Sequence, residues 1–151
     1  MVKAEEIIYD VIGNLRRLTA LENITVQSVE RSGYDFDVTI HGVTFACKVK
    51  TLLNKANYNL TIQQMKELET KSDKPQLIAA QHIVPDLFDK FLAEGISVVE
   101  SNGNCTINAT PLFIRISGQK TVLPKETKGK AFNEAGLKLI FYFLLEKGII
   151  N

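Results

Sequence analysis

Residues 34–50 read YDFDVTIHGVTFACKVK, and their side chains alternate between apolar and polar over almost the whole stretch. A period of two is typical of a β-strand, and His41-Gly42 supplies a two-residue turn near the middle. The stretch therefore predicts a β-hairpin with one face in the core of the protein. The expected core face comprises Tyr34, Phe36, Val38, Phe45, Cys47 and Val49.

The other face of this hairpin carries four charged residues. With the predicted turn, Asp35 lies opposite Lys48, while Asp37 and Lys50 lie diagonal to them on the same surface. One interpretation is an exposed face with cross-strand ion pairs, each worth roughly a few tenths of a kcal/mol. The other is a functional site built from two carboxylates and two ammonium groups. Both interpretations stay open at this point.

The sequence on either side of the hairpin predicts a mixed sheet with helices on both faces. An apolar stripe with helical spacing begins near the N-terminus, and a strand–helix–strand order later indicates a parallel βαβ unit. The expected fold class is therefore α/β, an antiparallel hairpin plus a βαβ unit flanked by helices. The predicted elements are a helix at 2–18, a strand at 24–30, a short helix at 60–71, a strand at 76–80, a helix opened by Pro85-Asp86, a strand at 96–100, and extended pieces at 105–108 and 112–117.

Composition places limits on the class of protein. The chain has 151 residues and a formal charge of +1, which fits one domain and argues against nucleic-acid binding by bulk charge alone. Positive charge is concentrated late, since residues 115–130 carry a net +4. Cys47 and Cys105 are isolated thiols without the spacing of a zinc site, so no cofactor is expected. Without a membrane span or signal peptide, we expect a cytoplasmic protein that does not contact a membrane.

The end of the chain predicts a separate element. Residues 118–131 are polar, and residues 133–147 are apolar on nearly every side when placed on a helix. We therefore expect one domain at 1–131 and a terminal helix within 132–151. A helix of this kind is normally covered by protein, so it is expected to be the first helix of a truncated unit or to pair with another chain, for example in a homodimer. The alternative is a native helix that packs on its own domain.

The hairpin resembles the signature of restriction-endonuclease-like PD-(D/E)xK nucleases. In that resemblance, DVTIHGVTFACKVK is similar to the family's acidic hairpin, with Asp37 or Asp35 as the first acid and Lys50 as the catalytic lysine. The resemblance implies a magnesium-dependent nuclease, because carboxylates hold that cation. The middle acid, however, falls on Lys48. An ammonium at a metal position repels the cation, so the chain is expected to lack nuclease chemistry.

A longer part of the chain is similar to the bacterial AbiEi-type family of antitoxins and transcriptional regulators. The similar stretches are QLIAAQHIVPDLFDKFLAEGISVVESNGN, LFIRISGQK and GKAFNEAGLKLIFYFLLEKGIIN. The resemblance implies a polar linker that enters the first helix of a winged-helix DNA-binding unit. The positions that carry it are Pro85, Gly95-Ile96, Gly103-Asn104, Gly118, Lys120, Gly129-Lys130, Phe132 and Ala135-Gly136-Leu137-Lys138.

Three functions follow from these features. The first is a non-catalytic nuclease-fold domain of a bacterial DNA-binding regulator or antitoxin. The second is a divalent-metal nuclease that uses Asp35, Asp37 and Lys50, with Glu67 or Glu69 as a substitute ligand. The third is a protein-interaction or dimerisation module. In the first, lysine side chains contact phosphates without reading sequence; these are Lys48, Lys50, Lys120, Lys125, Lys128 and Lys130.

Overall fold

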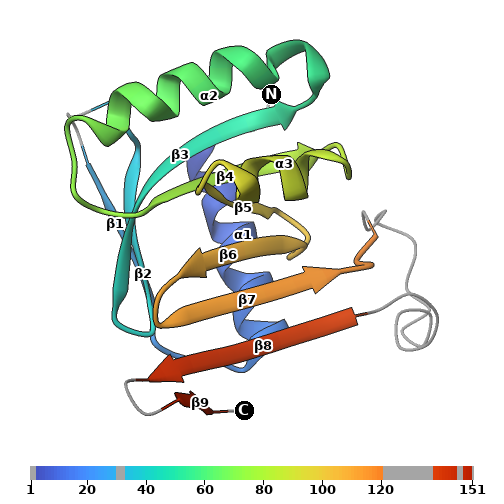
Figure 1. The fold of residues 1–151 in the computed structure, drawn as a ribbon. Helices are drawn as coiled ribbons and strands as arrows, with labels where there is room; N and C mark the ends of the chain where they lie inside the picture. The colour runs from blue at the N-terminus through green and yellow to red at the C-terminus, as the bar shows by residue number, and fades with distance from the viewer. Residues whose placement is uncertain (1–2, 30–32, 121–137, 146–147, 151) are drawn as a thin grey trace.

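A computed structural model of the chain describes residues 3–29, 33–120, 138–145 and 148–150. These residues form three helices and one mixed sheet, in which the strands lie side by side in chain order from β1 to β9 (Figure 1). The helices are α1 (Ala4–Thr19), α2 (Lys55–Glu69) and α3 (Leu87–Ala93). The strands are β1 (Ile24–Ser28), β2 (Phe36–Ile40), β3 (Val43–Leu53), β4 (Gln76–Ile83), β5 (Ser97–Glu100), β6 (Cys105–Ala109), β7 (Leu112–Ser117), β8 (Lys138–Leu145) and β9 (Gly148–Ile150).

The helices cover both faces of the sheet, so the predicted α/β class with a mixed sheet is confirmed. On one face, α1 buries an apolar stripe that includes Ile8 and Leu15 against the side chains of β2, β3, β6 and β7. On the other face, α2 and α3 pack with Met65, Leu87 and Phe91 over β3, β4 and β5 (Figure 1). No helix among the described residues is long and apolar enough to cross a membrane.

The hairpin of β2 and β3 forms as the sequence predicts. The two strands pair antiparallel from Phe36 opposite Cys47 to Ile40 opposite Val43. His41 and Gly42 make the turn with φ of 48° and 86°, the left-handed region that a two-residue hairpin turn requires. β1 then pairs antiparallel with β2 and completes a three-stranded meander.

The middle of the sheet is parallel. β3 pairs parallel with β4 and β4 with β5, so the predicted βαβ unit is confirmed and a second one precedes it. The helix expected at 60–71 begins earlier, at Lys55, because Asn54 and Asn57 form a capping box. The Asn54 side chain accepts from the backbone of Asn57, and the Asn57 side chain accepts from the backbone of Asn54, both at 3.0 Å.

The prediction of a terminal helix at 133–147 is wrong for the part of this range that the structure describes. Lys138–Leu145 is strand β8, which pairs antiparallel with β7, and Gly148–Ile150 is strand β9, which pairs with β8. The segment KLIFYFLL is a short continuous apolar run whose period cannot separate helix from buried strand, and its Ile, Phe and Tyr favour a strand. The homodimer expected to form through an apolar helix is therefore not supported at these positions, because they form strands. Residues 132–137 and 146–147 lie outside the described residues.

Candidate functional site

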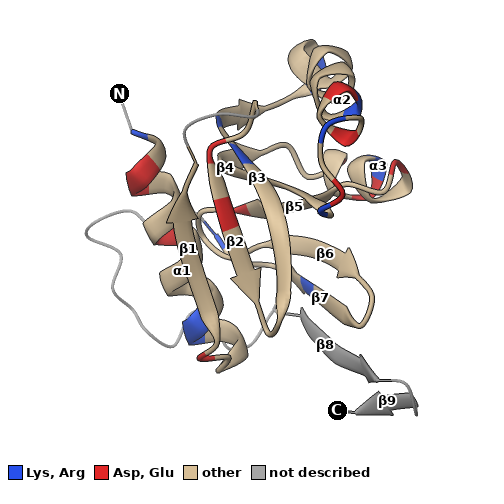
Figure 2. Cartoon of the chain, turned by 90° about the vertical axis from the view of Figure 1, so that its left-hand side faces the viewer, with Lys and Arg blue, Asp and Glu red and all other residues tan. Residues whose placement is uncertain are grey.

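The charged face predicted for the hairpin lies on the side of the sheet that α2 covers. Asp37 belongs to β2, and Lys48 and Lys50 belong to β3; in Figure 2, β2 carries an acidic band and β3 a basic one. All three side chains are half-buried. The predicted register is confirmed, but the four charged residues take partners other than one another.

Asp35 forms hydrogen bonds with the backbone of β3. Its Oδ2 accepts a hydrogen bond from the backbone N–H of Val49 at 2.8 Å, and its own N–H donates to the Cys47 carbonyl at 2.9 Å. β2 begins at the next residue, so the carboxylate takes the place of a strand partner for Val49. One of its two oxygens is therefore committed to a structural contact.

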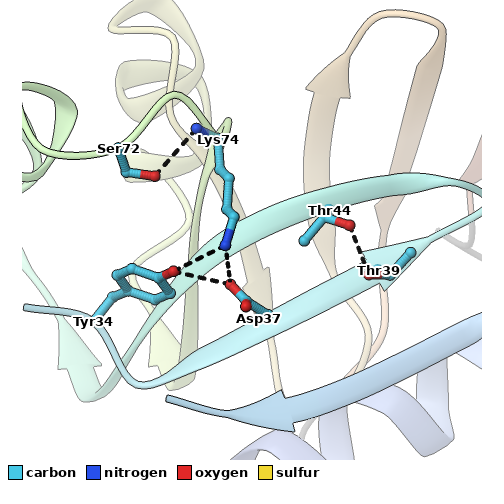
Figure 3. A network of polar contacts seen from close by, with 6 residues as sticks. All are labelled: Tyr34, Asp37, Thr39, Thr44, Ser72 and Lys74. Carbon is cyan, nitrogen blue, oxygen red and sulfur yellow. Dashed lines mark hydrogen bonds and ion pairs between the residues drawn. The ribbon is translucent and has the colours of Figure 1, made fainter. Parts of the chain in front are cut away.

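Asp37 is held in a network with Tyr34 and Lys74 (Figure 3). Its Oδ1 lies 2.9 Å from the Lys74 ammonium and accepts from the Tyr34 hydroxyl at 3.0 Å. The Lys74 ammonium also donates to the Tyr34 oxygen at 3.1 Å. The hydrogen bonds to Asp37 and then Tyr34 raise the pKa of Lys74 above its ordinary value. Tyr34, expected on the core face with Phe36, packs instead on the α2 side, because it precedes β2 and lies outside its alternation.

We expect the Lys74 contacts to stabilise the fold at neutral pH and to disappear at alkaline pH. A group whose pKa is raised on folding contributes its stability below the unfolded pKa, near 10.5, and loses it as pH rises through the folded pKa. Lys74→Met should therefore lower the free energy of unfolding by at most about 1 kcal/mol at pH 7, since the pair is partly exposed. Urea unfolding measured from neutral pH to pH 11 or above checks this. The control Lys55→Met, at an exposed lysine, should leave the pH dependence of stability unchanged. The prediction is contradicted if Lys74→Met lowers the free energy of unfolding by as much at the highest pH as at pH 7.

Lys48 and Lys50 place two ammonium groups under α2. Lys50 donates to Oε1 of Gln64 on α2 at 2.7 Å, and Lys48 reaches the Gly33 carbonyl at 3.4 Å. Burial, and then the charge of Lys48, lowers the pKa of Lys50. An anion bound beside the two ammonium groups would favour the charged form of each group and so offset their mutual repulsion.

A small cavity of about 150 Å³ opens beside Lys48. Glu67 and Lys71 of the α2 region share it with Gln64 and the Gly33 backbone. The carboxylate that the sequence suggested as a substitute metal ligand, Glu67, therefore lies among lysines; Glu69 is not part of this lining.

This donor set does not fit the divalent cation that the nuclease resemblance implies. Asp37 is paired with a lysine, Asp35 is bonded to a backbone amide, and an ammonium stands at the middle position. Within the described ranges, no three His, Cys, Asp or Glu side chains gather as metal ligands would.

The other predicted phosphate contacts are not gathered at this face. Lys120 follows β7 and lines a different cavity with Arg115 and Asp89. Lys125, Lys128 and Lys130 lie outside the described residues. The hairpin site therefore has two of the six predicted lysines, Lys48 and Lys50.

Sequence reasoning missed Lys74 and Tyr34 as the partners of Asp37, and Gln64 as the partner of Lys50. Lys74 lies 37 residues from Asp37 in a loop without periodicity, so no local pattern links the two. Gln64 lies on the polar side of an amphipathic helix. The sequence therefore indicates that its side chain is exposed, but it does not indicate which strand residue that side chain contacts.

The sequence matches no protein-family model and no curated protein, and the fold matches no solved structure.

Proposed function

We propose that this chain is a nuclease-fold domain without nuclease chemistry in a bacterial DNA-binding transcriptional regulator or antitoxin. The observation that carries the proposal is the pairing at the hairpin. In the resemblance, Lys48 corresponds to the middle acid and Lys50 to the catalytic lysine. Lys50 is bonded to Gln64, and Asp37, one of the two candidates for the first acid, is paired with Lys74. The face therefore suits a phosphate oxyanion better than a divalent cation.

The order of elements supports the nuclease-fold part of this proposal. A helix, an antiparallel meander, a second helix and a parallel strand follow one another from α1 to β4. This is the antiparallel hairpin joined to parallel strands that the resemblance implies, with helices on both faces of the sheet.

The chemistry of the two lysines supports phosphate contact. An ammonium binds phosphate as a point charge and makes no distinction between bases, so such contacts position a duplex without specifying its sequence. A bound phosphate would stabilise the charged form of Lys50, whose pKa is lowered by burial and by Lys48. Binding of DNA is then favoured by relief of the repulsion between the two ammonium groups.

A metal-dependent nuclease is the rival function, and one observation favours it. Glu67 lines the same small cavity as Lys48, which puts a carboxylate from α2 next to the hairpin site. In that case Asp35, Asp37 and Lys50 would carry the chemistry predicted from the resemblance.

Two assays on the same purified protein separate these functions. We expect a gel shift of duplex DNA at low salt that weakens steeply at high salt, with a logarithmic slope of about −0.9 per phosphate contact. We also expect duplex DNA and RNA to remain intact with Mg²⁺ or Mn²⁺. Cleavage that disappears in Lys50→Ala would establish the rival, and the absence of any shift at low salt would remove the DNA-binding part of the proposal.

A further inference from the structure

The side-chain amide of Gln64 has a fixed orientation. Its Oε1 accepts a hydrogen bond from the Lys50 ammonium at 2.7 Å, and both side chains are half-buried between α2 and β3. An ammonium group carries donors and no acceptor, so the amide atom that faces Lys50 is the oxygen. The nitrogen of a planar amide lies on the other side of the carbonyl carbon. The two N–H donors of Gln64 are therefore turned away from Lys50.

These two N–H donors are unused and accessible. Nε2 of Gln64 donates to none of the residues that the structure describes, whereas Oε1 is engaged. It is not shut off from water either, since within the described ranges Gln119 Nε2 is the one unpartnered side-chain atom that is fully buried. Gln64 thus presents donors to solvent from a side chain whose oxygen is held in place.

The small cavity beside Lys48 lies next to this amide. Its lining includes Gln64 and Lys48 but not Lys50, so Gln64 separates Lys50 from the cavity. Lys48 uses one of its three N–H groups on the Gly33 carbonyl, at 3.4 Å, and two remain for a ligand within the described part of the chain. Two neighbouring side chains, one neutral and one charged, therefore supply donors to the same space.

The acceptors around this cavity leave it suited to an anion. Its charged side chains are two lysines, Lys48 and Lys71, against one carboxylate, Glu67, which is exposed to water. Backbone carbonyls at the end of a helix would repel an anion if they were free. Those of the lining residues are occupied: Met65 accepts from the Gln76 side chain, Glu67 from the Thr70 hydroxyl, and Leu68 from the Lys71 N–H.

The size of the cavity limits what it can hold. A volume of about 150 Å³ is below the roughly 300–1,000 Å³ of sites that enclose a whole small molecule. The cavity therefore suits one compact group of a larger ligand, and a phosphate group matches donors that come from several directions.

We propose that this cavity is a subsite for a single phosphate group of the DNA backbone, to which Gln64 Nε2 and Lys48 Nζ donate. Lys50 is then a positioning residue as well as a positive charge, because it fixes the orientation of the Gln64 amide. The identity of the ligand as DNA rests on the proposed function, whereas the phosphate subsite itself does not.

A nuclear magnetic resonance titration of the nitrogen-15-labelled full chain tests the subsite with inorganic phosphate as the probe. We expect the side-chain amide signals of Gln64 to move with phosphate and not with chloride at equal ionic strength. The signals of Gln63, the exposed neighbour outside the lining, should stay in place. Lys50→Met should weaken phosphate binding because it releases the amide, and Lys50→Arg should restore it because the donor to Oε1 returns.

Gel shifts of duplex DNA test the same residue with two matched pairs of variants. Gln64→Leu should weaken binding by about tenfold, through loss of a hydrogen bond to a charged group, while Gln63→Leu should not. The salt slope should be unchanged in Gln64→Leu, since a neutral amide displaces no counterion, but shallower by about one unit in Lys48→Ala. Gln64→Glu keeps the acceptor for Lys50 and removes the donors, and should weaken binding more than Gln63→Glu, which adds the same charge.

The two experiments distinguish failure of the subsite from failure of the proposed function. Phosphate-dependent Gln64 signals without a DNA shift would support the subsite and remove DNA as its ligand. Three results would overturn the subsite: Gln64 signals that ignore phosphate, signals that move equally with chloride, or DNA binding that Gln64 and Gln63 variants weaken equally.

Discussion

A double variant, Lys48→Ala with Lys50→Ala, is expected to bind duplex DNA about thirtyfold more weakly than the unmodified protein at low salt. Each lysine–phosphate interaction contributes about 1 kcal/mol, and the variant removes two of them. The weakening should be similar for unrelated DNA sequences, because lysine contacts to phosphate do not read bases. The logarithmic salt dependence should also become shallower by about two units, one for each lysine. Gel shifts over a series of salt concentrations measure both quantities.

The matched control for this experiment removes two exposed lysines elsewhere. Lys55 and Lys90, on α2 and α3, are exposed and lie outside the small cavity beside Lys48. Their double Ala variant has the same net charge as the site variant and should retain most of the affinity. A Lys48→Arg, Lys50→Arg variant should also bind, since the positive charge remains. Equal weakening in the site variant and in the control would mean that overall charge, and not the hairpin face, holds the DNA.

Phe45→Ala is expected to lower the free energy of unfolding by about 3–5 kcal/mol. Phe45 is fully buried on the α1 face of β3, where it packs within the larger apolar cluster. Its truncation removes apolar packing and leaves a cavity between two rigid elements that cannot close around it. This change is a large share of the roughly 5–15 kcal/mol that stabilises a typical domain. Urea unfolding followed by circular dichroism measures it.

Two further variants make that result interpretable. Tyr9→Ala removes an aromatic ring that is 68% exposed on α1, and we expect a change of no more than about 0.5 kcal/mol. Phe45→Leu keeps most of the apolar volume and provides a folded protein if Phe45→Ala does not fold. A Phe45→Ala change as small as that of Tyr9→Ala would contradict the packing described for the α1 face.

Much of the α/β frame could be predicted because its signals are local. The period-two pattern of residues 34–50 and the His41-Gly42 turn together specify both strands of the hairpin and the residues that face each other. The apolar stripe of α1 and the strand–helix–strand order around α3 were likewise predictable. Where an apolar run has no period, as in Lys138–Leu145, helix and strand give the same pattern, and pairing with β7 decides between them.

The candidate site could be predicted only in part. The sequence by itself determined that Asp37, Lys48 and Lys50 share one face of a hairpin, because side chains alternate along a strand. Only the tertiary structure decided their partners: Lys74 reaches Asp37 from a loop after α2, and Gln64 meets Lys50 from within that helix. The same holds for the small cavity beside Lys48, whose lining combines Lys48 and Gly33 with the end of α2. The physical reason is that backbone periodicity is set by neighbouring residues, whereas the partner of a charged side chain is set by which elements pack against its strand.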